Sequence, residues 1–480
     1  MMNRKALSFL TASSAALLLA ACAVGPKAPD PTVPALGQGA FIGSQSASVS
    51  TEAARGDWWR LYNDATLDGL IQQALTENNE LEAAAANLRA VRASLSEARA
   101  GRLPSTNANA AFNRSQASTI TNPAANGAKL DDVDTYSVGL DVSYEVDLFG
   151  RVESTVRAAR ADAAAAAEAL EVVRITVAAE TARAYADTCS ANAQIAVAER
   201  TIDLQGKTVD LTQRLLDGGS GNGLDVARAR AALESTRASL PPLRAQRDGA
   251  LYRLATLTGR TPAEASEAAR GCQSPPQLSQ PIPVGDGAAL LARRPDVRQA
   301  EARLAAAAAR VNVATASLYP SISLGGSLGS TSLDSSDLGK DANFRFSVGP
   351  LISWNFPNIA VARARIKQTG ALTDAALATF DQTVLTALQE TETALSAYAN
   401  ELDRRTALRT ARDQAATAAR LSRLRFDAGA DSFLTVLDSE RTLAGADATL
   451  AASEAQVVTY QIALFKALAG GWDQVPNPEA

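Results

Sequence analysis

The sequence predicts an α+β membrane protein in which one series of helices and strands occurs twice. Long proline-free stretches carry apolar or small residues at alternating spacings of three and four, which is typical of packed helices. Two shorter stretches alternate polar and apolar residues, which indicates β-strands. Leu81–Pro104 resembles Val297–Pro320, and Asp217–Gly219 resembles Asp427–Gly429, so two copies lie about 210 residues apart. The chain is therefore an internal duplication.

The composition excludes several classes of function. Among 480 residues, 46 Lys and Arg stand against 51 Asp and Glu, and no basic block occurs, which argues against a nucleic-acid partner. The absence of histidine excludes histidine-dependent nucleophilic catalysis and histidine metal sites. Three cysteines cannot form a four-thiolate zinc site. The sequence therefore predicts no catalytic residue, no metal and no cofactor.

The first 21 residues have the pattern of a secretory signal peptide. Arg4 and Lys5 precede the apolar stretch Ala6–Ala20, which is too short to span a bilayer. Leu19–Cys22 resembles a bacterial lipobox, so we expect Cys22 to be lipidated, with ordinary cleavage beside an incidental cysteine as the alternative. Residue 23 is not Asp, which favours sorting to the outer membrane. Residues 22–56, rich in Pro, Gly, Ser and Ala, are then expected to be an extended tether.

Two further cysteines remain once Cys22 is assigned to lipidation. Cys189 and Cys272 would lie in an oxidising compartment, where a disulfide between them is plausible. The alternative is a pair of buried free thiols, because sequence alone does not give their separation.

The two copies have the same order of elements. The first repeat spans 57–270, a linker follows at 271–285, the second repeat spans 286–472, and a short tail ends the chain at 473–480. Each repeat is expected to hold a β-hairpin, near 105–148 and 321–356, and a long helical hairpin with its tip at 217–223 or 427–433. The proline-free stretches Arg151–Leu216 and Ile359–Phe426 could each form a helix of ~100 Å. Pro241 and Pro242 must break the helix that begins near Leu224.

The alternating stretches have the length of membrane strands. Tyr136–Val146 and Phe344–Trp354 alternate with period two over about the 9–11 residues that a spanning strand needs. Weaker strand candidates precede them, near 107–118 and 321–331. Four strands are too few to close a barrel, so spanning strands require several chains, and three copies supply 3 × 4 = 12 strands. The alternative is a half-buried sheet in a soluble domain.

Three functions compete at this point. The first is an export channel, the second is a periplasmic helical-rod lipoprotein that acts as a scaffold or adhesin, and the third is a cell-wall enzyme with paired carboxylates. The rod does not explain two alternating stretches at equivalent places in a duplication. Neither a phosphate-binding loop nor a cofactor fingerprint supports the enzyme. The channel is therefore favoured.

The mature chain as a whole resembles the outer-membrane factor family, the TolC-like channels, and among them the NodT/OprM-like lipoproteins. Several motifs in one order carry this resemblance, with the lipobox ahead of them: Asp57–Arg60, Tyr144–Arg151, Leu224–Ala229, Arg293–Val297, Leu318–Pro320 and Lys466–Trp472.

The resemblance implies a homotrimer in the outer membrane, surrounded by its lipid. Twelve shared strands would form one β-barrel, and the long helices would continue it as an α-barrel into the periplasm. The family's members are passive exit ducts of tripartite pumps, through which small molecules such as drugs leave the cell. A periplasmic membrane-fusion adaptor and an inner-membrane transporter would be the partners.

The resemblance also assigns roles at the hairpin tips. Arg425–Leu434 matches the family's second tip, so Leu434 and Asp438 fall where the family narrows its closed periplasmic entrance, and Arg441 is spaced to pair with Asp438. We expect Asp225 and Ser432 to cap the outgoing helices. Phe426 replaces a tyrosine that is frequent in the family, and Pro357-Asn358 departs from the Gly150-Arg151 junction of the first repeat. The residues expected to contact the adaptor are Gly218, Gly219, Leu224, Asp225, Val226, Gly429, Asp431, Leu434 and Val436.

Overall fold

The computed structural model describes residues 24–27, 29, 34–118, 130–354, 356 and 359–468. The signal peptide, Cys22, the Pro357-Asn358 pair and the 473–480 tail lie outside these ranges. The described chain forms two compact units. Unit 1 includes Leu88–Ala166 and Ala300–Phe380, and unit 2 includes Ala167–Gln299 with the described parts of Thr32–Asn87 and Asp381–Ala480. Each repeat therefore contributes residues to both units.

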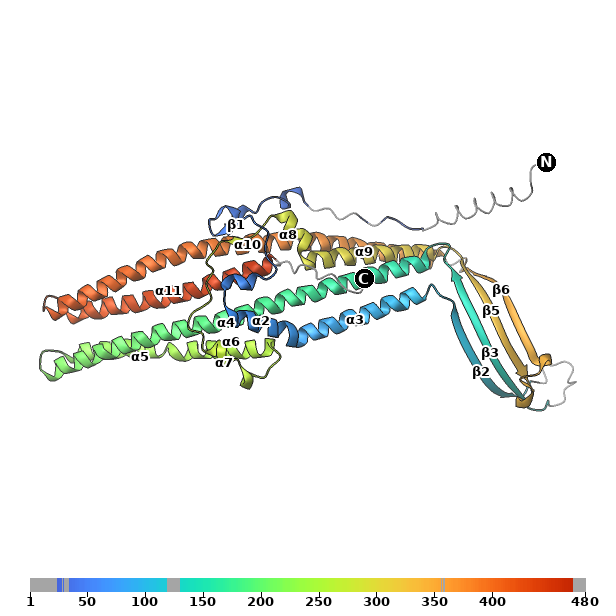
Figure 1. The fold of residues 1–480 in the computed structure, drawn as a ribbon, viewed down its shortest axis with the longest axis horizontal. Coiled ribbons are helices and arrows are strands. Elements are labelled where there is room, and N and C mark those ends of the chain that lie inside the picture. The colour runs from blue at the N-terminus through green and yellow to red at the C-terminus, as the bar shows by residue number, and fades with distance from the viewer. Residues whose placement is uncertain are drawn as a thin grey trace. The chain divides into compact units, whose positions relative to one another are not determined.

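A four-stranded antiparallel sheet is the main feature of unit 1 (Figure 1). Its strands are β2 (Ser105–Ser115), β3 (Val133–Val146), β5 (Ser321–Ser332) and β6 (Phe344–Ser353), in the order β2-β3-β5-β6. The two hairpins lie side by side because β3 pairs with β5 over eleven positions, from Tyr136 to Val146. The predicted hairpins are confirmed, with β2 beginning two residues earlier and ending three residues earlier than expected.

Two long helices follow the hairpins. They are α4 (Arg151–Asp217) and α10 (Ile359–Asp427), and each contributes residues to both units. The helices that precede the hairpins are α3 (Asn79–Ala100) and α9 (Pro295–Ala316), which are the two copies of the sequence repeat. In unit 1, Arg310 of α9 forms an ion pair with Asp162 of α4 at 2.6 Å. Within the described ranges, no helix combines the length and the apolar character that crossing a membrane requires.

Unit 2 contains two helical hairpins (Figure 1). In the first, α4 returns through α5 (Gly223–Arg237) and α6 (Leu240–Leu257). The break between α5 and α6 confirms the predicted effect of the proline pair, which occupies the first turn of α6, where a missing N–H costs nothing. In the second hairpin, α10 returns through the uninterrupted α11 (Phe433–Ala467), and Arg412 pairs with Asp447 at 2.8 Å between them.

The hydrophobic core of unit 2 gathers around aromatic residues. Trp58 stacks on Phe465 of α11 with ring centroids 4.7 Å apart, and both are buried with Ile71 of α2 (Ala65–Glu77). Trp59 donates its indole N–H to Asp68 at 2.8 Å. The two tryptophans of the Asp57–Arg60 motif are thus part of the hydrophobic core of unit 2.

Residues 34–56 of the expected tether form part of unit 2. Phe41 and Val49 are buried in the core of unit 2, and Glu392 of α10 accepts the backbone N–H groups of Ile42 at 2.6 Å and Gly43 at 3.1 Å. β1 (Val49–Ser50) also pairs in parallel with β4 (Ile282–Pro283) of the linker. The prediction of an extended tether as far as residue 56 was therefore wrong in this part, because a few apolar residues within a small-residue segment suffice to dock it.

A disulfide joins Cys189 of α4 to Cys272, with Cα atoms 5.0 Å apart, so the expected bonded pair is present and the alternative of two free thiols is not. Cys272 follows the short helix α7 (Glu267–Arg270) and is the second residue of the linker between the repeats. Asn192 donates from Nδ2 to the carbonyl of Cys272 at 2.8 Å. The linker is thus fixed to α4 by a covalent bond and a hydrogen bond.

Candidate functional site

The sheet of unit 1 has one apolar face and one polar face. Directly paired residues point to the same side of a sheet, and the registers pair even positions with even and odd with odd throughout. The apolar face consists of the even-numbered strand residues. One of its rows runs Ala108, Leu140, Leu328 and Phe346, and the last three are exposed in the single chain. The four strands thus present apolar side chains that are largely exposed in the described chain, whereas Ser330 and Ser332 near the end of β5 are buried.

The polar face consists of the odd-numbered strand residues, mostly Ser, Asn, Gly and Thr. Asn109 donates to Asp141 at 2.9 Å, and the hydroxyl groups of Ser327 and Ser347 lie 2.8 Å apart. The alternation along each strand, which the sequence indicated for β3 and β6, therefore extends across all four strands. Such a sheet suits a boundary between lipid and water.

The hairpin tips are closed by the same turn in both repeats. Gly219 and Gly429 have φ of +75° and +72°, a left-handed conformation that glycine adopts without the cost that a Cβ imposes. The amide of Ala430 donates to the carbonyl of Arg425 at 2.8 Å, and that of Ser220 donates to Leu215 at 2.9 Å. The predicted turns are thus present between Asp217 and Gly223 and between Asp427 and Phe433.

The caps differ from the expected ones. Asn222, not Asp225, caps α5, because its Oδ1 accepts the backbone N–H of Asp225 at 2.9 Å. Ser432 occupies the N-cap position of α11 without a side-chain bond to the backbone, and its hydroxyl lies 3.3 Å from that of Thr435. Asp225 instead accepts from Nδ2 of Asn222 at 2.8 Å. Asn222 directly precedes Gly223, the first residue of α5. It was therefore a better N-cap candidate than Asp225.

The nine tip residues divide into exposed and buried groups. Leu224 and Leu434 are 57% and 50% exposed, whereas Val226 and Val436 are buried between helices. The two valines therefore hold the hairpins together and offer no surface to a partner, which corrects their place in the predicted docking set. The exposed members are Gly218, Gly219, Leu224, Gly429 and Leu434, with Asp225 and Asp431 partly exposed.

The predicted gate residues Leu434, Asp438 and Arg441 lie near the start of α11. Leu434 and Asp438 are both exposed, and Asp438 forms an ion pair with Arg441 at 3.5 Å. Both charged side chains are well exposed, so the pair contributes little stability. Phe426, which stands where the family often has tyrosine, packs edge-on against Phe433 with ring centroids 5.8 Å apart. An aromatic contact thus closes the second tip at this position.

A buried charged cluster lies further along the same helices, and sequence analysis missed it. Arg423 of α10 pairs with Glu440 of α11 and donates to Thr208 of α4 at 2.9 Å, while Thr208 donates to Glu440 at 3.0 Å. Glu440 is only 5% exposed. The cluster joins the second hairpin to the first, and no spacing in the sequence connects position 208 to the other two.

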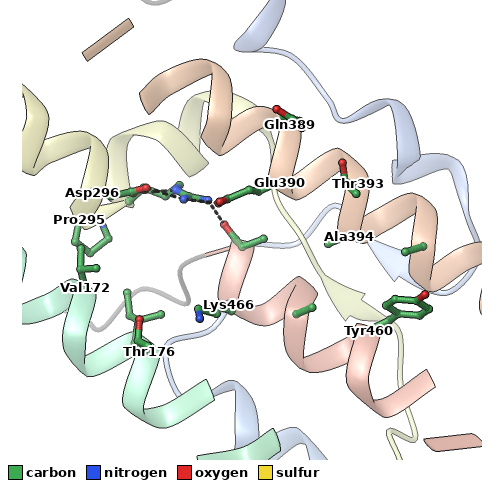
Figure 2. A pocket seen from close by; sticks show the side chains of 15 residues that line it. Val172, Thr176, Pro295, Asp296, Gln389, Glu390, Thr393, Ala394, Tyr460 and Lys466 are labelled. Atoms are coloured by element: carbon green, nitrogen blue, oxygen red, sulfur yellow. Dashed lines mark hydrogen bonds and ion pairs between the residues drawn. The ribbon is translucent and has the colours of Figure 1, made fainter. Parts of the chain in front are cut away.

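A second charged cluster surrounds Arg294, within the Arg293–Val297 motif (Figure 2). Its guanidinium donates to Asp296 at 2.7 and 2.9 Å, to Glu390 of α10 at 2.8 Å and to the carbonyl of Ala467 at 2.8 Å. Burial alone would lower the pKa of Arg294, but the hydrogen bonds and charges of Asp296 and Glu390 outweigh burial and raise this pKa. Arg294 therefore fastens the end of α11 to α10 and to the start of α9.

An open groove of about 580 Å³ adjoins this cluster. Its walls come from α4, α9, α10 and α11, and Figure 2 shows Lys466 and Tyr460 along the α11 side. Small and apolar side chains such as Val172 and Ala394 form most of its surface. Of the charged residues that line the groove, Arg294 contacts Asp296 and Glu390, and Lys466 lies 3.4 Å from a carboxylate oxygen of Glu180.

Comparisons with known proteins identify the family. The model of the outer membrane efflux protein family matches residues 70–260 and 288–470. The pyoverdine export outer membrane protein OpmQ of Pseudomonas aeruginosa is 32% identical over 98% of both chains, and OprJ of the same species is 31% identical over 96% of this chain and 95% of its own. The solved outer-membrane channel OprN superposes with a TM-score of 0.87 at 34% identity, covering 94% of this chain and all of that one. This chain therefore belongs to the outer membrane efflux protein family.

Proposed function

We propose that three copies of this chain form one twelve-stranded (3 × 4) outer-membrane barrel, which serves as the exit duct of an efflux pump. The observation that carries the proposal is the sheet with two faces, since its apolar side suits lipid and its polar side suits a water-filled lumen. In the described chain β2 and β6 each have one neighbour, and an open edge is not tolerated in lipid. Pairing β6 of one copy with β2 of the next satisfies both edges.

The duct would conduct passively from the periplasm to the exterior. In this orientation the segment 333–343 between β5 and β6 would face outward, and the helical hairpins would lie in the periplasm. Lipidation of Cys22 would add an anchor beside the barrel. The energy for export would come from the transporter of the inner membrane.

The helical hairpin tips are the proposed contact for the periplasmic adaptor and the proposed gate. Three copies of Leu434 would make an apolar constriction, and three copies of Asp438 beside it would make an acidic ring whose repulsion favours opening or cation binding. Leu224 and Asp225 on the first tip and Gly429 and Asp431 on the second are proposed to meet the adaptor.

Crosslinking in native membranes tests the assembly. We expect a ladder that ends at three copies, in membranes that carry the full-length chain. A monodisperse soluble monomer, obtained when the signal and Cys22 are deleted, would contradict the shared barrel. A related test of the duct is export, because cells without the chain should become more sensitive to compounds that the pump removes, and the wild-type gene should restore resistance.

A further inference from the structure

We propose that Arg345 gives the outer part of the lumen a ring of positive charge that attracts anionic solutes. This proposal rests on the proposed function, because the polar face lines a lumen only when three copies share a barrel. Arg345 is the second residue of β6, next to the segment 333–343 that would face the exterior. Its odd position places it on the polar face.

One glycine on the neighbouring strand, Gly329, makes room for the arginine on this face. The registers align Asn109, Gly139, Gly329 and Arg345 in one row across the four strands. A Cβ atom at Gly329 would lie 3.6 Å from Nε of Arg345 and only 2.6 Å from the carbonyl oxygen of Val138. The arginine side chain therefore extends over β5, where the neighbouring position carries no side chain, and it does not turn back toward the apolar face.

The charge of Arg345 is not neutralised within the described chain, where no carboxylate oxygen lies within ion-pair distance of it. Two other ionisable side chains, both acidic, belong to the polar face. Glu145 pairs with Arg151, and Asp141 accepts from Asn109 on the far side of the sheet from β6. In the preceding segment, Lys340 pairs with Asp337.

Threefold symmetry would repeat this cation around the lumen. Fixed charges of one sign on a water-filled wall raise the local concentration of the opposite charge. The duct would then have acidic Asp438 side chains at its periplasmic end and arginines near its outer end. Solutes that carry carboxylate, phosphate or sulfonate groups would be concentrated near the exit. Because fixed charges supply no energy for transport, the ring would raise the rates of anion exit and anion entry equally.

A cysteine at position 347, two residues after Arg345 on the same face of β6, would report the local electrostatic potential. This measurement does not depend on whether the periplasmic gate is open or closed. We would replace Ser347 with cysteine, since the two other described cysteines are bonded to each other. Intact cells would be treated with a sulfonate-bearing or a trimethylammonium-bearing methanethiosulfonate, and the two modification rates compared. We expect Arg345→Gln to lower the anionic-to-cationic rate ratio about three- to tenfold, and less at high salt.

Two controls make the result specific. Arg114 lies near the same end of the sheet but on the apolar face, where it pairs with Asp132 at 3.2 Å and with Asp134 at 3.5 Å, so Arg114→Gln should leave the ratio unchanged. Phe346→Cys, on the apolar face, should react slowly with both reagents. Crosslinking would verify the trimer in every variant.

The outcomes separate the two proposals. An unchanged ratio in Arg345→Gln, with a reactive Ser347→Cys and an intact trimer, would overturn the anion-attracting ring and leave the duct in place. An unreactive Ser347→Cys beside a reactive Phe346→Cys would reverse the two faces, and would overturn both the ring and the barrel as proposed here.

Discussion

At each hairpin tip an exposed leucine stands two residues before a buried valine. Leu224 precedes Val226 in α5, and Leu434 precedes Val436 in α11. Two residues on a helix are separated by about 200°, so one side chain of the pair faces the partner helix and the other faces away. The duplication has kept this arrangement in both repeats. The leucines are thus available for a constriction or a partner, whereas the valines stabilise the hairpins.

Replacing Leu434 and Asp438 together with alanine should open the periplasmic end. Both side chains are exposed and alanine keeps the helix propensity, so the helices should remain intact while the apolar plug and the acidic ring disappear. Single-channel conductance in planar bilayers should rise, and cells should become sensitive to large antibiotics. Leu224→Ala is the matched control and should have the smaller effect. Unchanged conductance with an intact trimer would place the constriction elsewhere.

The buried Arg423–Glu440 pair should matter more for stability than the exposed Asp438–Arg441 pair. Glu440→Gln leaves a largely buried guanidinium without its counter-charge, which we expect to cost about 2–4 kcal/mol. Asp438→Asn should cost much less, since both partners are well exposed. Hydrogen exchange of the first turns of α11 measures the difference. If the double variant Arg423→Met, Glu440→Leu proved as unstable as Glu440→Gln, the unpaired charge would not be the cause.

Among the elements, those with a local signal in the sequence were predicted and those made by distant contacts were not. Alternation revealed β3 and β6, glycines revealed both tips, and Pro241 with Pro242 marked the start of α6. The Thr208–Arg423–Glu440 cluster and the Arg294 contacts join positions far apart in the chain. No periodicity encodes them, because they depend on how the helices pack.

The docking of residues 34–50 on unit 2 shows a second limit. The composition of this segment predicted an extended chain. Composition is an average, however, and it does not show that single apolar residues can bind the segment to the core. Phe41 and Val49 are each buried, and Glu392 accepts two consecutive backbone N–H groups from this segment. One aromatic anchor with a carboxylate beside it outweighs the flexibility of its Gly- and Ser-rich neighbours.

The disulfide between α4 and the linker should stabilise the first helical hairpin. It closes a loop of 83 residues that includes α5, α6 and α7, and cross-links of this span typically contribute about 2–4 kcal/mol. The double variant Cys189→Ala, Cys272→Ser should fold but melt at a lower temperature. Reducing agent should shift the wild-type chain to the same temperature and leave the variant unaffected. Equal melting temperatures for the oxidised wild type and the variant would show that packing alone holds the linker.

For the whole molecule, the barrel rather than the lipid is expected to determine insertion. One acyl anchor gives modest and reversible binding, while the twelve strands of the proposed trimer would bury a complete apolar surface in the bilayer. Cys22→Ser should therefore lose its lipid, as radiolabelled palmitate would report, yet retain much of its trimer in the outer membrane. Complete loss of folded trimer in this variant would assign the anchor a structural role.

The pairing of β3 with β5 has a consequence for the origin and assembly of such a channel. It joins two hairpins from successive repeats by the same antiparallel contact that β6 of one chain and β2 of the next would form. Six hairpins around the barrel would then be nearly equivalent, so an ancestral half-length chain with a single hairpin would require six copies for the same twelve strands. Fusion of two such half-length chains would replace half of the seams between subunits by covalent continuity. Assembly would then be third order rather than sixth order in chain concentration, which would favour closed barrels when few chains are present.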